Sequence, residues 1–92
     1  MFGKNDQPST SADTRTFPSV SDRDATIRQI LGVVYEALEE KGYNPVSQIV
    51  GYILSEDPAY ITNYKNSRTL ITKFDRDELL DAITRYYFKK TE

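Results

Sequence analysis

Hydroxyl side chains are concentrated in the first 21 residues, MFGKNDQPSTSADTRTFPSVS, which contain four serines and three threonines. One of them, Thr14, is followed directly by Arg15. A protein kinase binds its acceptor hydroxyl in an extended segment, so a tail of this composition suits phosphorylation. Such tails are also common where no hydroxyl is modified, and composition alone favours that ordinary interpretation.

Four acidic residues form a second group that could do chemistry: Asp75, Asp77, Glu78 and Asp81. Carboxylates bind calcium and magnesium, but these four lie in the first turns of a predicted helix, where acids cap free amides and offset the helix dipole. The chain has no histidine to complete a metal site, and the glycine of a calcium-binding loop is absent. We therefore prefer a structural role and expect no metal or other cofactor.

Catalytic patterns are missing. The sequence contains no pairing of a nucleophile with a base, no glycine-rich phosphate loop and no Walker pattern. Without histidine or cysteine it also lacks the commonest acid–base group, the commonest metal ligand and any disulfide. We expect a protein that is not an enzyme.

Basic and polar residues gather between positions 65 and 73: Lys65, Asn66, Arg68, Thr69 and Lys73. On the exposed face of a short helix they could contact DNA, so a small helix-turn-helix nucleic-acid-binding regulator is the alternative hypothesis. The 12 basic and 14 acidic residues give a net charge of −2, which makes the affinity for phosphates modest. The same side chains suit an acidic protein surface at least as well.

The chain is long enough for one small domain. Residues 1–21 show no helix or strand periodicity and too few apolar residues to offset the entropy of ordering them, which predicts a flexible tail before a helical domain at 22–92. No apolar run approaches the roughly 20 residues that a membrane span needs, and the N-terminus lacks the apolar core of a signal peptide. We expect a cytoplasmic protein that does not insert into membranes.

The stretch EEKGYNPVSQIVGYILSEDPAY, from 39 to 60, has the clearest local signals. Lys41-Gly42 predicts the end of one helix, and Asn44-Pro45 predicts the start of the next, with asparagine as the cap and proline in the first turn. Glu56-Asp57-Pro58 ends that helix. Its apolar residues recur at helical spacing, and we predict that they form the core: Val46, Ile49, Val50, Ile53 and Leu54.

Three further helices are expected, at about 22–41, 65–74 and 76–89. Ser21 or Asp22 can cap the first, and Asp75 with Glu78 is a capping-box pattern for the last. No segment alternates with a period of two, so the predicted fold is all-α, a compact bundle of about four short helices. The predicted apolar faces are Ile27, Ile30, Leu31, Val34 and Leu38 in the first helix and Leu79, Leu80, Ile83, Tyr86 and Tyr87 in the last.

Two glycines and two tyrosines add detail to these helices. Gly32 and Gly51 lie inside predicted helices, where they either permit a close approach of another element or are simply tolerated. Tyr60 and Tyr64 are expected to anchor the connection that follows Pro58.

The size of the domain favours self-association. About 70 residues in four helices bury only about 60% of the surface that the unfolded chain exposes. The apolar stripes on the first two helices are also broad, so we expect a homodimer.

The central stretch also carries a resemblance. LEEKGYNPVSQIVGYILSEDPAYI, followed by NSR and then FDRDELLDAITRYYF, closely resembles the IreB family of regulatory phosphoproteins from Gram-positive bacteria, over about residues 12–90. The resemblance implies a small helical homodimer without catalytic activity. It also implies phosphorylation by a membrane-bound Ser/Thr kinase with PASTA domains, removal of the phosphate by a matching phosphatase, and control of peptidoglycan synthesis and cephalosporin resistance. In part of the family this control works through Clp-protease turnover of the enolpyruvyl transferase that commits material to peptidoglycan, so a protein client or Clp-adaptor machinery is an implied partner.

The same resemblance implies the site residues. The family's acceptor threonine follows an acidic residue and precedes an aromatic residue by three positions, as Thr14 does within ADTRTF; Thr16 is the second choice. Residues 62–64 depart from the family, where proline and arginine usually precede an aromatic residue or histidine. The predicted partner-binding residues, chosen for their positive charge, are Lys65, Arg68, Lys73 and Arg76, of which Arg68 and Lys73 are expected to be exposed.

Overall fold

The computed structural model describes residues 20–89 of the 92-residue chain, with side chains from Asp22 onward. Four α-helices follow one another: α1 (Val20–Glu40), α2 (Pro45–Ser55), α3 (Ser67–Ile71) and α4 (Arg76–Tyr87). Two short 3-10 helices, η1 (Pro58–Tyr60) and η2 (Tyr64–Asn66), lie between α2 and α3. Within residues 20–89 no strand is present, which confirms the predicted all-α fold.

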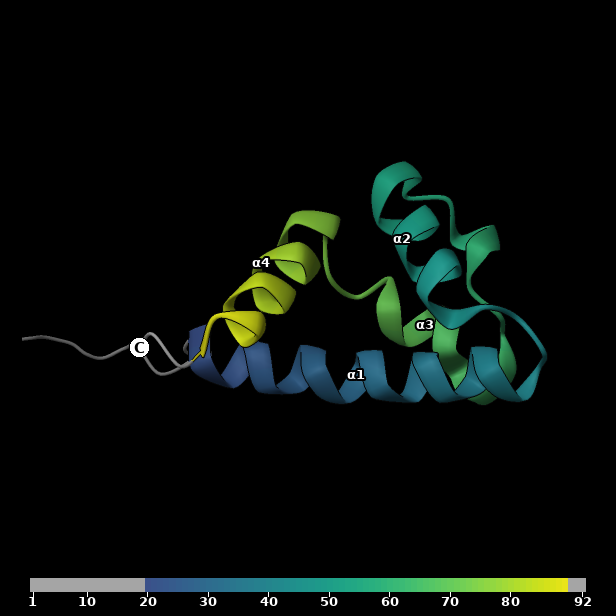
Figure 1. Cartoon of the computed structure of the whole chain (residues 1–92), viewed down its shortest axis with the longest axis horizontal. Coiled ribbons are helices and arrows are strands. Elements are labelled where there is room, and N and C mark those ends of the chain that lie inside the picture. Colours follow the sequence, from purple (N-terminus) through teal and green to yellow (C-terminus); the bar gives the residue numbers. More distant parts are fainter. Residues whose placement is uncertain (1–19, 90–92) are drawn as a thin grey trace, which may run out of the picture.

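The long helix α1 is the base of the molecule, and the other helices lie along one side of it (Figure 1). In the same view α2 and α3 lie over the C-terminal half of α1, and α4 lies over its N-terminal part. None of the helices between residues 20 and 89 combines the length and the apolar character that crossing a bilayer requires.

The predicted ends of α1 and α2 are confirmed. Gly42 has a φ of +86°, and the Tyr43 amide donates to the Leu38 carbonyl at 3.0 Å, as in a glycine-terminated helix. The Asn44 side chain accepts a hydrogen bond from the Ser47 amide at 3.1 Å, and Pro45 occupies the first turn of α2.

The start of α4 is also as predicted, whereas the start of α1 is not. The Asp75 amide donates to Glu78 Oε1 at 2.9 Å, one half of the predicted capping box. By contrast, α1 begins at Val20, so Ser21 and Asp22 lie within the helix and not before it.

The core is built on α1. Its buried residues recur every three or four positions and meet buried residues from each later segment. From α1 these are Ile27, Ile30, Val34, Ala37 and Leu38; from the rest they are Tyr52, Ile61, Ile71, Leu79 and Ala82.

The prediction that the apolar stripe of α2 forms the core is wrong for the three residues on the outer side of the stripe. Val46, Val50 and Leu54 are 60%, 48% and 73% exposed. Tyr52 is the buried residue of α2, and Ile49 and Ile53 pack partly against the core. Helical spacing identifies the apolar residues of α2, but the apolar surface is wider than the part that α1 covers. Spacing alone therefore does not show which of these residues are buried.

The predicted face of α4 needs the same correction. Leu79 is buried as expected, together with the small Ala82, but the remaining apolar residues are exposed. They are Leu80, Ile83, Tyr86 and Tyr87.

Between α2 and α3 the buried anchor is Ile61, whereas the expected anchors Tyr60 and Tyr64 keep about two fifths of their surface exposed. Tyr60 does pack closely on α2, because a Cβ built on Gly51 would lie 2.5 Å from Cε1 of its ring. Gly51 therefore permits a close approach, whereas a Cβ on Gly32 would meet nothing within 4 Å.

The two glycines give a matched stability test. Gly32→Ala should raise the free energy of unfolding by up to about 1 kcal/mol, because alanine is the better helix former. Gly51→Ala has the same gain in helix propensity but should be less stable than Gly32→Ala, because the added methyl must displace the Tyr60 ring, and displacing packed groups costs about 1–3 kcal/mol. Urea unfolding measures both, and equal stability of the two variants would contradict the close approach at Gly51.

Candidate functional site

The predicted phosphoacceptors, Thr14 and Thr16, lie outside the described residues. The predicted partner-binding residues lie within them and are here called the basic set: Lys65, Arg68, Lys73 and Arg76. The contacts of each decide which of them a partner could reach.

Lys65 pairs with the end of α1. It lies in η2 with a φ of +56°, and its Nζ is 2.9 Å from Glu40 Oε2. The same ammonium lies 5.5 Å from the centre of the Tyr64 ring. The hydrogen bond from Lys65 lowers the pKa of the Glu40 carboxyl and raises the pKa of Lys65 itself. Lys65 thus connects η2 to α1.

Arg68 is half-buried, so the prediction that it is exposed is wrong. Its Nε donates to the carbonyl of the buried residue Ile61 at 3.0 Å. A half-buried guanidinium that satisfies a backbone carbonyl stabilises the connection between η1 and α3. Sequence could not show this contact, because it depends on how the connection folds back on α3.

Arg76 joins α4 to the end of α2. Its Nη1 donates to the Leu54 carbonyl at 3.0 Å, and its Nε lies 3.8 Å from Glu56 Oε1. Leu54 O is one of the last carbonyls of α2, which lack partners within their own helix. Half of the Arg76 side chain nevertheless remains exposed.

Lys73 is the exception in the basic set. It is exposed, as predicted, and among residues 22–89 no hydrogen bond or ion pair engages its side chain. The basic set therefore does not form one free basic face: three members hold structural contacts and Lys73 is available. These contacts, and the five-residue length of α3, give the helix-turn-helix alternative no support.

The acids of α4 also take part in contacts that position the helix. Glu78 caps the helix and lies 3.7 Å from Nη1 of Arg23, while Asp81 accepts from Nη2 of Arg85 at 3.1 Å. Within residues 20–89 no group of three or more acidic side chains is placed to hold a metal ion.

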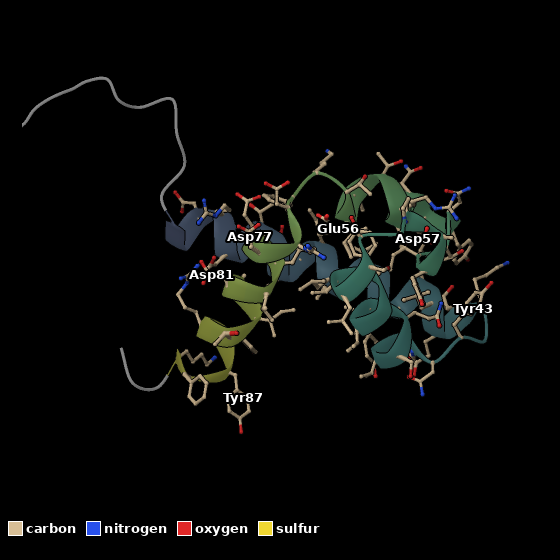
Figure 2. The ribbon with its side chains drawn as sticks, turned by 90° about the horizontal axis from the view of Figure 1, so that it is seen from above. Tyr43, Glu56, Asp57, Asp77, Asp81 and Tyr87 are labelled. Carbon is tan, nitrogen blue, oxygen red and sulfur yellow. The ribbon has the colours of Figure 1, made fainter. Side chains whose placement is uncertain are left out.

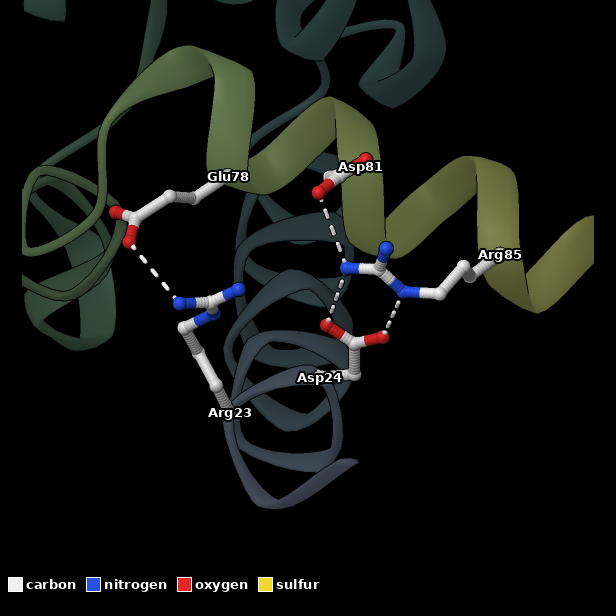
Figure 3. Close-up of polar contacts among 5 residues, drawn as sticks. All are labelled: Arg23, Asp24, Glu78, Asp81 and Arg85. Carbon is white, nitrogen blue, oxygen red and sulfur yellow. Dashed lines mark hydrogen bonds and ion pairs between the residues drawn. The ribbon is translucent and has the colours of Figure 1, made fainter. Parts of the chain in front are cut away.

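A polar cluster that sequence reasoning missed joins the first turns of α1 to α4 (Figure 3). Arg85 forms two hydrogen bonds with the Asp24 carboxylate, from Nε at 2.7 Å and from Nη2 at 3.3 Å. The Asp24 side chain is only 9% exposed. Asp24 and its partner Arg85 are 61 residues apart in the sequence.

The electrostatics of this cluster follow from that geometry. The hydrogen bond from Arg85 lowers the pKa of Asp24 below its ordinary value of 3.8, against the opposing effect of burial, and the same bond raises the pKa of Arg85. Nε of the neighbouring Arg23 is buried and has no hydrogen-bond partner among the described residues.

Asp24→Asn should lower the free energy of unfolding at neutral pH by about 1–2 kcal/mol, because it removes the charge from a hydrogen-bonded pair that is only partly screened by solvent. A carboxyl group whose pKa is lower in the folded than in the unfolded protein stabilises the fold at pH values above its unfolded-state pKa. This stabilisation is lost as the pH falls through the folded-state pKa. The difference between wild type and variant should therefore shrink as the pH drops below 3.8.

Thermal unfolding at a series of pH values measures this difference. Asp81→Asn is the matched control, since it removes a more exposed carboxylate from the same guanidinium and should cost less. A pH-independent loss in Asp24→Asn would contradict the role of the ion pair.

Comparison with known proteins gives concordant matches. The family model described as "IreB regulatory phosphoprotein" matches residues 12–89. A "UPF0297 protein" from Ruminiclostridium cellulolyticum is 47% identical over 77 residues, which cover 84% of this chain and 88% of the relative. A "UPF0297 protein" from Lachnoclostridium phytofermentans is 50% identical over 74 residues, covering 80% of this chain and 84% of that relative.

Proposed function

Because this chain belongs to the IreB regulatory phosphoprotein family, we propose that it is a cytoplasmic, non-enzymatic regulator whose activity is set by phosphorylation of Thr14. The observation that carries the proposal is the extent of the family match. It begins at Ala12 and so includes Thr14, which lies six positions before the first residue of α1.

The proposed kinase is a membrane-bound Ser/Thr kinase with PASTA domains, and a matching phosphatase reverses the reaction. The regulated process is peptidoglycan synthesis, with cephalosporin resistance as its consequence, through a protein client or Clp-dependent turnover of the committing enolpyruvyl transferase. These assignments rest on membership of the family, and each is a proposal for this chain.

The chemistry of the switch is electrostatic. A phosphate on Thr14 adds a charge of about −1.5 to −2 and three strong acceptor oxygens. It can pair with an available cation of this protein or repel an acidic client that binds there. Lys73 is the member of the basic set that suits either role, since the other three already hold contacts within the domain.

Phosphorylation should occur mainly at Thr14. Thr14→Ala should abolish most phosphate incorporation by the purified kinase, and Thr16→Ala should leave it nearly unchanged, as intact-protein mass spectrometry would measure. Incorporation that survives Thr14→Ala and disappears with Thr16→Ala would place the acceptor two residues later.

The regulatory effect is tested in cells. Thr14→Ala should hold cephalosporin resistance in one state, and Lys73→Ala should weaken control while leaving the melting temperature unchanged, because Lys73 is an exposed surface residue. Arg68→Ala is unsuitable as a control, since loss of its bond to the Ile61 carbonyl affects folding.

We also propose that the protein is a homodimer whose protomers meet through Val46, Val50 and Leu54, here called the α2 stripe. These residues lie at i, i+4 and i+8 on one side of α2 and are exposed. From Pro45 to Ser55 α2 contains no charged residue, so two copies can pack about a two-fold axis without bringing like charges together.

Val50→Lys should convert the dimer to a monomer in sedimentation experiments at micromolar concentration, since it places two ammonium groups in an apolar interface. Because Val50 is half exposed in the protomer, the helical far-UV spectrum should persist. Sedimentation of the wild-type protein as a monomer would contradict the dimer, and an unchanged Val50→Lys dimer would place the interface elsewhere.

A further inference from the structure

A hollow of about 370 Å³ lies between α1 and α4. It is here called the α1–α4 hollow, and its walls are mainly apolar. The lining residues are Arg28 and Leu31 from α1 and Ala82, Ile83 and Tyr86 from α4. Its volume falls at the lower end of the roughly 300–1,000 Å³ that is usual for binding pockets.

The apolar surface continues along α4 beyond the hollow. Leu80, Ile83 and Tyr87 lie at i, i+3 and i+7 and are all exposed. Figure 2 shows Tyr87 at the C-terminal end of α4, pointing away from the other helices. Seven residues of helix span about 10 Å, which is enough to contact nearly two turns of a docked helix.

Two cations border this apolar surface. Arg28 Cζ lies 5.3 Å from the centre of the Tyr86 ring, and Lys89 Nζ lies 4.6 Å from it. Neither forms an ion pair with a carboxylate among residues 22–89, whereas the nearby Arg85 is paired with both Asp24 and Asp81. The hollow therefore has a positive border although the whole chain is acidic.

We propose that the α1–α4 hollow binds an amphipathic helix of a partner protein whose apolar side chains are flanked by glutamate or aspartate. Apolar side chains of that helix fill the hollow and cover Ile83, and its carboxylates pair with Arg28 and Lys89. The α2 stripe of a second copy fits less well, because α2 has no acid to offer these two cations. The inference goes beyond the proposed function and does not depend on phosphorylation of Thr14.

The probe is a fluorescently labelled helical peptide of about 15 residues, with leucine at every third or fourth position and glutamate at most others. Its counterpart carries lysine in place of every glutamate. Anisotropy titration with the full chain should show at least tenfold tighter binding of the glutamate peptide, and added salt should weaken it. Equal binding of the two peptides, or no binding of either, would overturn the proposal.

Three variants locate the binding surface. Ile83→Lys places a charge in the hollow and should weaken binding of the glutamate peptide at least tenfold. Arg28→Gln and Lys89→Gln should each weaken it severalfold and reduce its salt dependence. Lys41→Gln removes the same charge from an exposed residue just after the C-terminal end of α1 and should leave binding unchanged; an equal loss there would mean non-specific attraction and would overturn the proposal.

Melting and sedimentation of the variants separate a loss of binding from a loss of folding or of a dimer. Melting of each variant checks the fold, and if Arg28→Gln unfolds, Lys89→Gln at the exposed end of α4 decides the electrostatic part. Sedimentation of Ile83→Lys should match that of the wild type. Dissociation of a dimer by Ile83→Lys would mean that a second copy covers the hollow. The partner proposal would then fail, whereas the proposal that Thr14 is phosphorylated would be unaffected.

Discussion

Burial of one side of α1 is the interaction on which the rest of the structure depends. Ile27, Val34 and Leu38 are completely buried, and α2, η2, α3 and α4 all contact this helix. The other α-helices have between five and 12 residues, and isolated helices of that length are marginal in water. Their stability therefore comes from contact with α1, in agreement with the arrangement in Figure 1.

Polar contacts then set where each short helix lies on α1. The Asp24–Arg85 pair holds the C-terminal part of α4, Lys65 holds η2 to Glu40, and Arg76 joins α4 to α2. Most basic residues between positions 65 and 85 are therefore engaged within the domain. Whether a cation is available to a partner depends on its tertiary contacts, which the residue type does not show. A partner surface inferred from basic residue types alone is therefore too large, and in the basic set Lys73 remains available.

Signals that depend on near neighbours were predictable from sequence. The Asn44 cap, the Gly42 helix end and the hydrogen bond of Glu78 to the Asp75 amide each involve residues within five positions of one another, so local chemistry determines them. Contacts between distant segments were not predictable in this way. Asp24 and Arg85 are 61 residues apart, and neither residue type nor spacing indicates that they meet.

The same distinction applies to burial and to the site. Helical spacing identified the apolar residues of α2 and α4, but which of them α1 covers depends on packing angles, so Tyr52 and Ala82 are buried while Leu54 and Tyr87 are exposed. The phosphoacceptor is a different case. Composition alone favoured an ordinary hydrophilic tail, and the choice of Thr14 came from the resemblance to a family.

The exposed apolar residues are the feature that folding alone does not explain. Each of the helices α2 and α4 buries only one or two residues in the core and leaves a longer apolar row exposed, and contiguous exposed rows of this kind mark interaction surfaces in soluble proteins. Their charge environments differ. The row on α2 lies on a helix without charges, which suits an identical helix, whereas the row on α4 adjoins Arg28 and Lys89, which suit carboxylates. Two apolar surfaces on one small domain are thus distinguished by their neighbouring charges, which suit the proposed dimer on α2 and the proposed acidic partner on α4.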